Sequence, residues 1–307
     1  MKTATLLAPA LAALPAAAQN YPVKPVRIIV PYAAGGNTDI TARAVGAKLA
    51  EAFGQQVIVD NRPGGATNIG SELAAKAAPD GYTLFMGGAS NAINMSLYAK
   101  PPYDTLRDFA PVSLCVKGAN VLSTHPSLPV KTLKELIALA KARPGTLNFA
   151  SSGLGSSNQM AGELLKVMAG INIVHVPYKG NAPALTDTVA GHVEMVFSGV
   201  PALVPHIKSG RLRAIAISSL ERFPAVPEVP TFNESGVKGY EASNWFGLMA
   251  PIKVSKDIIN KVNADVNKAL AMKDVREKFD RDGLITKGGS TEDFGRFIRA
   301  ETEKYAN

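Results

Sequence analysis

The 307-residue chain has a single cysteine, Cys115, which excludes an intramolecular disulfide and leaves packing to stabilise the fold. Cys115 lies between Leu114 and Val116, and this apolar setting predicts a buried, inert thiol rather than a nucleophile or a cofactor attachment point. Beyond the N-terminal region, no stretch approaches the roughly 18 unbroken apolar residues that a membrane span needs. Lysine and arginine are scattered without a polybasic run, so the net charge of +8 indicates a solvated basic surface and no nucleic-acid partner.

The motifs of metal and group-transfer chemistry are also missing. The four histidines are not paired at a metal-binding spacing, and there is no cysteine cluster. The sequence contains no G-x-S-x-G elbow, no G-x-x-x-x-G-K-[ST] phosphate loop and no G-x-G-x-x-G after the first strand. Ser151 comes nearest to an elbow, with Gly153 two residues on but Phe149 where the first glycine would stand. We therefore expect no metal, no cofactor and no catalytic residue.

The first 18 residues are typical of a secretory signal peptide. They carry one charge, Lys2, followed by a mostly apolar stretch over residues 4–14 and an A-x-A cleavage site at Ala16 and Ala18. The apolar stretch is too short for a permanent membrane anchor, and no cysteine stands at the cleavage site to carry a lipid. We therefore predict a soluble, exported protein whose mature chain begins at residue 19.

Two halves of the sequence repeat one order of strand, polar loop and helix, which is typical of α/β layering. The predicted strands cover residues 27–32, 57–59 and 82–86 in the first half and 146–150, 173–178 and 193–197 in the second. The loops that follow them cover residues 33–37, 61–68, 87–91, 151–157, 179–183 and 198–201. Ligands bind at the carboxyl edge of an open parallel sheet, so the pattern predicts two such edges acting as two jaws.

The segments that connect the halves predict a discontinuous first lobe. Residues 109–123 have the character of an extended crossover, and residues 212–218 with the proline-rich segment 223–230 are predicted to return the chain. We therefore expect lobe 1 to comprise residues 19–122 and 224–307, and lobe 2 to comprise residues 123–223. Two connections permit a hinge, and a hinge between two jaws permits closure on a ligand.

The first loop, residues 33–37, runs into a helix that Thr38 or Asp39 can cap. Gly35 and Gly36 let a ligand approach the backbone closely, and the N–H groups at the helix start form a cradle for an anion. Taken alone, this loop fits a tight turn without a ligand equally well. Similar polar loops follow strands in both halves, and this repetition favours the binding of a small anion. Neutral donors at helix N-termini hold a carboxylate without a buried counter-charge, each terminus contributing roughly 0.3–1 kcal/mol.

Seven short motifs are spread along the whole mature chain, each occurring once and in a characteristic order. They are Tyr21-Pro22, the run from Val30 to Asp39, the run from Asn61 to Gly65, the run from Ala78 to Thr83, the run from Val176 to Gly180, Pro230-Thr231 with Glu234, and the run from Trp245 to Gly247. In order and spacing they resemble the Bug receptor family, the substrate-binding proteins of tripartite tricarboxylate transporters. The resemblance implies a type II periplasmic binding-protein fold, with two lobes, a ligand cleft and two crossover segments.

The resemblance also implies that the first loop holds a carboxylate, often through ordered water. Carried onto this chain, the implied ligand contacts are Tyr32, Ala34, Gly35, Gly36, Asn37, Thr38, Thr67, Asn68, Ser90 and Asn91 from lobe 1, and Ser151, Ser152, Ser156, Ser157, Tyr178, Lys179 and Ser198 from lobe 2. Asp39 matches the motif as well, but its acid suits a helix cap better than an anion contact. Gln159 stands where relatives frequently have histidine, and Ser198 where many have an acid. Because position 198 carries a serine instead of an acid, a ligand ammonium group would lack a partner there. We therefore predict that the ligand is a simple or aromatic carboxylate rather than an amino acid.

The resulting functional hypothesis is a periplasmic, monomeric receptor without catalytic activity. It would capture a di- or tricarboxylate or an aromatic carboxylate and deliver it to the membrane components of a tripartite tricarboxylate transporter. A second possible class of function is an enzyme on the same fold, but the sequence contains no nucleophile and base pair for it. The effector lobe of a transcription regulator is a third, which the signal peptide and the lack of an N-terminal helix-turn-helix segment disfavour. A receptor that signals without transport is a fourth, and the sequence does not separate it from the first.

Overall fold

The computed structural model describes residues 21–306, so the predicted signal peptide lies outside the described residues. The strands are β1 (Val26–Val30), β2 (Val57–Asn61), β3 (Thr83–Gly88), β4 (Phe109–Thr124), β5 (Asn148–Ser151), β6 (Val174–Pro177), β7 (Met195–Gly199), β8 (Arg213–Ile217), β9 (Ser243–Pro251) and β10 (Leu284–Thr286). The helices are α1 (Asn37–Phe53), α2 (Asn68–Ala75), α3 (Ala89–Leu97), α4 (Thr105–Asp108), α5 (Leu133–Ala142), α6 (Ser157–Ala169), α7 (Asn181–Val189), α8 (Val200–Lys208), α9 (Lys256–Ala271), α10 (Lys273–Arg281) and α11 (Thr291–Lys304), with a 3-10 helix at Gly65–Thr67. Within residues 21–306, no helix is both long and apolar enough to cross a membrane.

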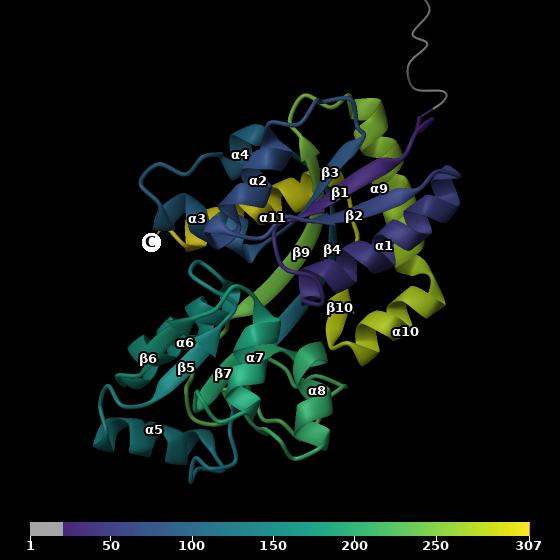
Figure 1. Ribbon diagram of the computed structural model, residues 1–307. Helices are drawn as coiled ribbons and strands as arrows, with labels where there is room; N and C mark the ends of the chain where they lie inside the picture. Colours follow the sequence, from purple (N-terminus) through teal and green to yellow (C-terminus); the bar gives the residue numbers. More distant parts are fainter. Residues whose placement is uncertain (1–20, 307) are drawn as a thin grey trace, which may run out of the picture.

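The elements form two lobes, drawn one above the other in Figure 1. In the upper lobe, lobe 1, β1 pairs in parallel with β2 and β3, while β9 pairs antiparallel with both β3 and β4. Successive residues of β1 point to opposite faces: Ile28 packs with α1 and α9, whereas Ile29 packs with α3 and α11. Both faces of the sheet are covered by helices, which explains why its strands are almost continuously apolar.

Lobe 2 repeats this plan with a different set of strands. Its strand β5 pairs in parallel with β6 and β7, while β7 and β8 pair antiparallel with the second part of β4. Phe149 of β5 packs with residues of α5 and α6, and its neighbour Ala150 packs with residues of α7 and α8. The predicted fold class, an α/β protein with two lobes joined by two crossover segments, is confirmed.

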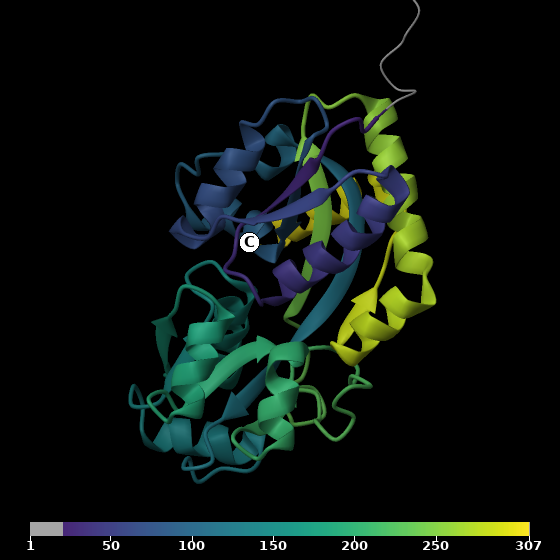
Figure 2. The same cartoon turned by 45° about the vertical axis from the view of Figure 1, so that its right-hand side comes forward.

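Two long strands connect the lobes side by side (Figure 2). Residues 109–119 of β4 pair with β9 of lobe 1, and residues 120–124 of the same strand pair with β7 in lobe 2. The predicted extended crossover at 109–123 therefore corresponds to β4. The other crossover is the start of β9, where Ser243 pairs with Ala119.

The sequence placed the return crossover at residues 212–230, and the structure corrects this. The strand β8 pairs with β4 inside lobe 2, and Phe223, Val226 and Val229 of the proline-rich segment are buried in the core of that lobe. Tyr240 is also buried there, stacked on Phe232 at a ring-centroid distance of 4.0 Å. Burial of these apolar side chains outweighs the tendency of prolines to mark a linker. We propose that the lobe boundaries lie near residues 119 and 242 rather than 122 and 223.

Several local predictions are met at single residues. Gly54 and Gly170 end α1 and α6 in the left-handed conformation, each at φ 60°, as expected for glycine after the last turn of a helix. Cys115 is fully buried, and this burial raises its thiol pKa to about 12, so the thiol is unreactive. Ser90 and Asn91, in contrast, were predicted in a loop but lie in the first turn of α3.

Candidate functional site

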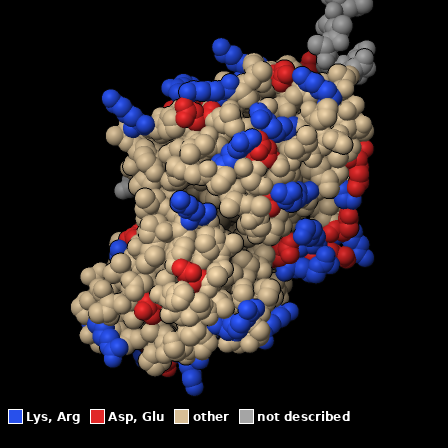
Figure 3. All heavy atoms as spheres, viewed as in Figure 1, with Lys and Arg blue, Asp and Glu red and all other residues tan. Residues whose placement is uncertain are grey.

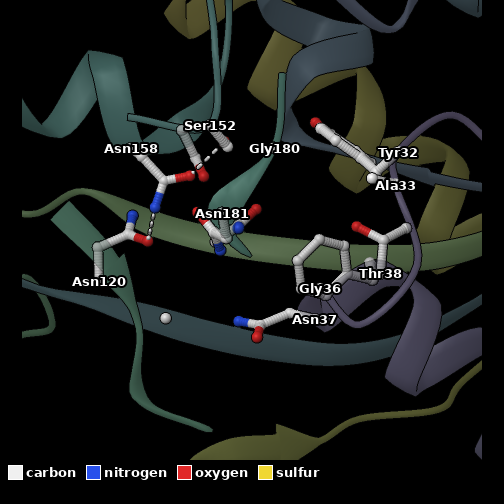
Figure 4. A pocket seen from close by; sticks show the side chains of 14 residues that line it. Tyr32, Ala33, Gly36, Asn37, Thr38, Asn120, Ser152, Asn158, Gly180 and Asn181 are labelled. Atoms are coloured by element: carbon white, nitrogen blue, oxygen red, sulfur yellow. Dashed lines mark hydrogen bonds between the residues drawn. The ribbon is translucent and has the colours of Figure 1, made fainter. Parts of the chain in front are cut away.

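A cavity of about 430 Å³, counted with its open mouth, lies between the two lobes. We call it the inner cavity. Its lining residues are Tyr32, Ala33, Gly36, Asn37 and Thr38 from the β1–α1 segment, Asn120 from β4, Ser152, Ser157, Asn158, Gly180, Asn181 and Gly199 from lobe 2, and Asn244 and Phe246 from β9. Figure 4 shows the β1–α1 residues facing the lobe 2 residues across this space. No charged side chain is among these lining residues of the described chain.

Four helices begin at the inner cavity. The residues Asn37, Ser157, Asn181 and Val200 are the first of α1, α6, α7 and α8, and each of them lines the cavity or directly follows a residue that does. Such N-termini carry unpaired N–H groups and the positive end of the helix dipole. The site is therefore electrically suited to an anion although it contains no cation.

Glycine stands at the N-cap of three of these helices. Gly36, Gly180 and Gly199 precede α1, α7 and α8, and within the described chain none of these helices has a side-chain cap. The fourth helix, α6, is capped by Ser156, whose hydroxyl accepts from Gln159 N–H at 3.2 Å. A side-chain cap would occupy the N–H groups that a ligand needs. Glycine leaves these groups open to the cavity.

Asparagine amides supply the other polar atoms of the inner cavity. Asn158 Nδ2 donates to Asn120 Oδ1 at 3.0 Å, and Ser152 Oγ donates to Asn158 Oδ1 at 2.7 Å, as Figure 4 shows. Among the described residues, no partner is present for the buried atoms Asn120 Nδ2, Asn37 Oδ1 and Asn181 Oδ1. A buried polar atom without a partner costs roughly 1–3 kcal/mol. A ligand or an ordered water at this place would complete the hydrogen bonding of these atoms.

The two lobes touch at the inner cavity. Asn37 of lobe 1 is 7% exposed and lies against Gly199 of lobe 2, where an added Cβ would collide with its Nδ2. Ala33 of lobe 1 approaches Gly180 of lobe 2, since a Cβ on Gly180 would lie 3.5 Å from the Ala33 Cβ. The structure thus shows the closed arrangement, in which glycines let the lobes meet.

Asp39 has a different role from the helix cap that the sequence predicted. The helix begins at Asn37 with Gly36 as its N-cap, so Asp39 lies in the first turn. Its Oδ2 accepts from Gly35 N–H and from Arg43 Nε, both at 2.9 Å, and its Oδ1 accepts from Asn61 Nδ2 at 3.0 Å. The Gly35 N–H is consequently occupied inside the protein, and the cradle for a ligand narrows to the N–H groups that follow Gly36.

A pH-dependent stability follows from these contacts. Burial opposes ionisation of Asp39, but the hydrogen bonds from Arg43, Gly35 and Asn61 outweigh it, so the pKa of Asp39 lies below its usual value. Its contribution to stability is present above the unfolded-state pKa of about 3.9 and is lost as the pH falls through the lower folded-state value. We expect Asp39→Asn to lower the urea midpoint at pH 7, and the gap from wild type to shrink below about pH 4. Urea unfolding followed by circular dichroism at several pH values measures this, and a gap that stays constant would contradict it.

A second cavity adjoins the first and is larger, about 1330 Å³ with its open mouth. We call it the outer cavity. It is lined by Pro31, Tyr32, Pro63, Gly64, Gly65, Ala66, Thr67, Ser90 and Tyr98 of lobe 1, and by Ser152, Gly153, Leu154, Ser156, Pro177, Tyr178 and Lys179 of lobe 2. Tyr32 and Ser152 line both cavities, which therefore adjoin at these two residues.

The structure divides the sequence-predicted contacts into three groups. Tyr32, Gly36, Asn37, Thr38, Ser152 and Ser157 line the inner cavity, and Thr67, Ser90, Ser156, Tyr178 and Lys179 line the outer one. Ala34, Gly35, Asn68, Asn91, Ser151 and Ser198 line neither cavity. Placement beside a cavity makes the first two groups candidates for ligand contact, and their role stays a prediction.

The residues of the third group are bonded to other protein groups, buried within a strand or exposed outside both cavity linings. Asn91 is 1% exposed, and its Nδ2 donates to Ser71 Oγ at 3.0 Å. Asn68 Oδ1 accepts from Asn94 Nδ2 at 3.0 Å, while Ser198 is fully buried within β7. Ala34 is exposed and lines neither cavity. We do not propose these residues as ligand contacts.

Eight lining residues of the inner cavity were not predicted. They are Ala33, Asn120, Asn158, Gly180, Asn181, Gly199, Asn244 and Phe246. Glycines directly before a helix, at 180 and 199, are a signal that sequence reasoning could have used once they are recognised as open N-caps. Asn120 and Asn244 lie within the crossing strands, where no local pattern distinguishes them.

The structure also brings together a serine and a histidine that the sequence did not pair. Ser151 Oγ and His175 Nε2 lie 2.6 Å apart on the neighbouring strands β5 and β6. Ser151 is fully buried, its hydroxyl also contacts the Gly153 carbonyl at 3.2 Å, and burial lowers the pKa of His175. Ser151 lines neither cavity, and we do not propose this pair as a catalytic group. In the part of the chain that the structure describes, no group of three His, Cys, Asp or Glu side chains is arranged to hold a metal ion.

Comparisons with known proteins agree on one family. The model of the tripartite tricarboxylate transporter family receptor matches residues 41–307. Protein BugT of Bordetella pertussis is 40% identical over 296 residues, which cover 96% of this chain and 91% of BugT. The structure of R. palustris Rpa4515 with adipate has a TM-score of 0.90 at 36% identity, covering 93% of this chain and 96% of that one. The structure of MatC from Rhodopseudomonas palustris with bound malate has a TM-score of 0.89 at 31% identity, covering 93% and 99%.

Proposed function

This chain belongs to the tripartite tricarboxylate transporter receptor family, and we propose that it captures a small organic carboxylate in the periplasm for delivery to the membrane components of such a transporter. Adipate and malate, the ligands of the two similar structures, are both dicarboxylates. The single observation that carries the proposal is the uncharged inner cavity onto which four helix N-termini open.

The composition of the inner cavity favours an anion, such as a carboxylate, over a cation. Helix N-termini and amide donors stabilise negative charge, and the open N-cap glycines allow direct approach to backbone N–H groups. An ammonium group would meet the positive ends of the same helix dipoles, with no lining carboxylate to pair with it. We infer that the protein discriminates against amino acids.

Binding without turnover completes the proposal. The family is one of receptors, and Ser151, which contacts His175, is fully buried and lines neither cavity. Acidic and basic side chains are intermixed over the face shown in Figure 3, which offers no single-sign patch for nucleic acid. We propose that the receptor acts as a monomer.

The malate and aspartate pair tests the proposed ligand class. The two molecules differ only in a hydroxyl or an ammonium group on one carbon. We expect malate to bind at least about tenfold more tightly, a difference of about 1.4 kcal/mol or more, because the inner cavity has no acid for the ammonium. Isothermal titration calorimetry of the mature protein with each compound measures both affinities. If aspartate or glutamate binds far more tightly than dicarboxylates without an ammonium group, such as malate, the proposed ligand class is wrong.

A further inference from the structure

The segment that leads into α2 has an uncommon backbone conformation. Gly64, Gly65, Ala66 and Thr67 have φ values of 120°, 55°, 53° and 75°, so four successive residues lie in the region that glycine favours. Within residues 21–306, Ala66 and Thr67 are the only residues other than glycine with positive φ. A Cβ atom crowds the backbone in this conformation, and residues that carry one adopt it singly rather than in succession. We call residues 64–67 the left-handed turn.

The left-handed turn forms part of the outer cavity. All four of its residues line the lobe 1 side of this cavity, and residues 152–154 of lobe 2 line it as well. If the backbone of Ala66 rotated to negative φ, this part of the wall would move and the space between the lobes would change shape. The conformation of the turn therefore helps to determine the form of the outer cavity.

One buried amide from another helix holds the left-handed turn. Asn94 of α3 is fully buried, and its Nδ2 donates to the Ala66 carbonyl at 2.8 Å. The same nitrogen lies 3.2 Å from Thr67 Oγ1 and 3.0 Å from Asn68 Oδ1. Ser71 Oγ also donates to the Thr67 carbonyl, at 2.9 Å, but it belongs to α2, which the turn itself begins. Asn94 thus ties the strained peptide to a separate element of lobe 1.

The oxygen of the same amide faces lobe 2. An added Cβ on Gly155 would lie 2.6 Å from Asn94 Oδ1, so the two lobes meet at this point. Among the described residues, no hydrogen-bond partner is present for the buried Asn94 Oδ1. Burying an unpartnered oxygen is unfavourable. The amide oxygen therefore opposes closure of the lobes, whereas the amide nitrogen holds the turn.

We propose that Asn94 is a positioning residue for ligand capture, whose Nδ2 holds the left-handed turn in the conformation that shapes the outer cavity when the lobes close. The proposal rests on the carboxylate-binding function given above, and Asn94 acts through the turn because it lines neither cavity itself. If Asn94 served packing alone, its removal would delete the unpartnered oxygen and make closure on a ligand easier. The positioning role predicts the opposite sign, which is weaker binding.

Calorimetry with adipate tests this sign. We expect Asn94→Ala to bind adipate at least about tenfold more weakly than the wild-type protein, because a methyl group offers the turn no donor. Adding Ala66→Gly to this variant should recover at least about fivefold in affinity, since glycine adopts positive φ without strain. The same substitution in the wild-type protein should gain less, because the turn is already held there. Urea unfolding verifies that each variant is folded, and Asn94→Leu, which fills the space without a donor, replaces an unfolded alanine variant.

The matched control is Ala75→Gly, which places a glycine in the right-handed backbone at the end of α2, outside both cavities. It should not improve the affinity of Asn94→Ala. Crystal structures of the wild-type protein and of Asn94→Ala show the turn directly, and we expect positive φ at Ala66 in the first and negative φ in the second.

Three results would overturn the positioning role while the carboxylate receptor stands. They are unchanged or tighter adipate binding by Asn94→Ala, equal recovery from Ala66→Gly and Ala75→Gly, and positive φ at Ala66 in both crystal structures. If no carboxylate binds the wild-type protein, the proposed function itself fails, and the φ of Ala66 still decides whether Asn94 holds the turn.

Discussion

Replacing Gly199 with alanine is expected to reduce ligand affinity by at least about 100-fold, or about 2.8 kcal/mol, while each lobe stays folded. The backbone at Gly199 (φ −65°, ψ 149°) is one that alanine adopts without strain. Its new Cβ, however, would collide with Asn37 Nδ2 and would lie 2.9 Å from Asn37 Cγ and 3.0 Å from Oδ1. Either the lobes remain apart or the Asn37 amide leaves the inner cavity, and both outcomes remove contacts that the ligand needs.

Calorimetry and small-angle X-ray scattering together measure this effect. With saturating adipate, we expect the wild-type protein to contract and Gly199→Ala to remain extended. The matched control is the double variant Gly199→Ala, Asn37→Ala, which deletes the three colliding atoms and should regain the compact form without regaining affinity. Wild-type affinity in Gly199→Ala would show that the closed arrangement described here is not the one that binds ligand.

Replacing Gly36 with valine is expected to abolish measurable binding and to leave the unfolding midpoint nearly unchanged. The backbone at Gly36 (φ −85°, ψ 169°) suits a β-branched residue, and an added Cβ meets only the Ala33 carbonyl, at 3.9 Å. The fold therefore tolerates the side chain. The cavity does not, because Gly36 lines it at the N-cap of α1, where an isopropyl group would cover the N–H groups that face the ligand.

Ala34→Val is the matched control for this variant. It places the same isopropyl side chain within the same loop, adding two methyl groups to the existing Cβ of a residue that is exposed and lines neither cavity. We expect the control to bind carboxylate like the wild-type protein in calorimetry, and both variants to unfold in urea at the wild-type midpoint. Equal loss of affinity in the two variants would point to a general disturbance of the loop, and unchanged affinity in Gly36→Val would refute the cradle.

Much of the fold follows from local patterns. The alternation of side chains between the two faces of β1, with Ile28 and Ile29 on opposite sides, and the left-handed glycines at Gly54 and Gly170 are encoded within a few residues. The position of the second crossover is not encoded in this way. The prolines of residues 223–230 predict a linker, whereas tertiary burial of Phe223 and its neighbours holds that segment within lobe 2.

Only part of the site was predictable from the sequence, and a physical reason separates the predicted residues from the others. Gly36, Asn37 and Thr38 were predicted because a glycine loop between a strand and a helix is a local signal. Asn120 and Asn244 were not, because a polar residue within a strand faces the cleft or another partner according to how distant segments pack. Ser90 and Asn91 were predicted together, but only Ser90 lines the outer cavity, whereas Asn91 bonds to Ser71.

The sequence by itself determined an α/β protein of two lobes, with glycine-rich loops at the strand ends and without the motifs of metal or covalent chemistry. It also indicated neutral donors as the means of holding a carboxylate. The tertiary structure alone decided which of those donors are free: Asp39, fixed by Arg43 and Asn61, occupies the Gly35 N–H, while Gly36 opens onto the cavity. The reason is that the partner of a hydrogen-bonding group depends on the folded geometry: Asp39 accepts from Gly35 and Arg43, each four residues away, and also from Asn61, which a neighbouring strand brings beside it.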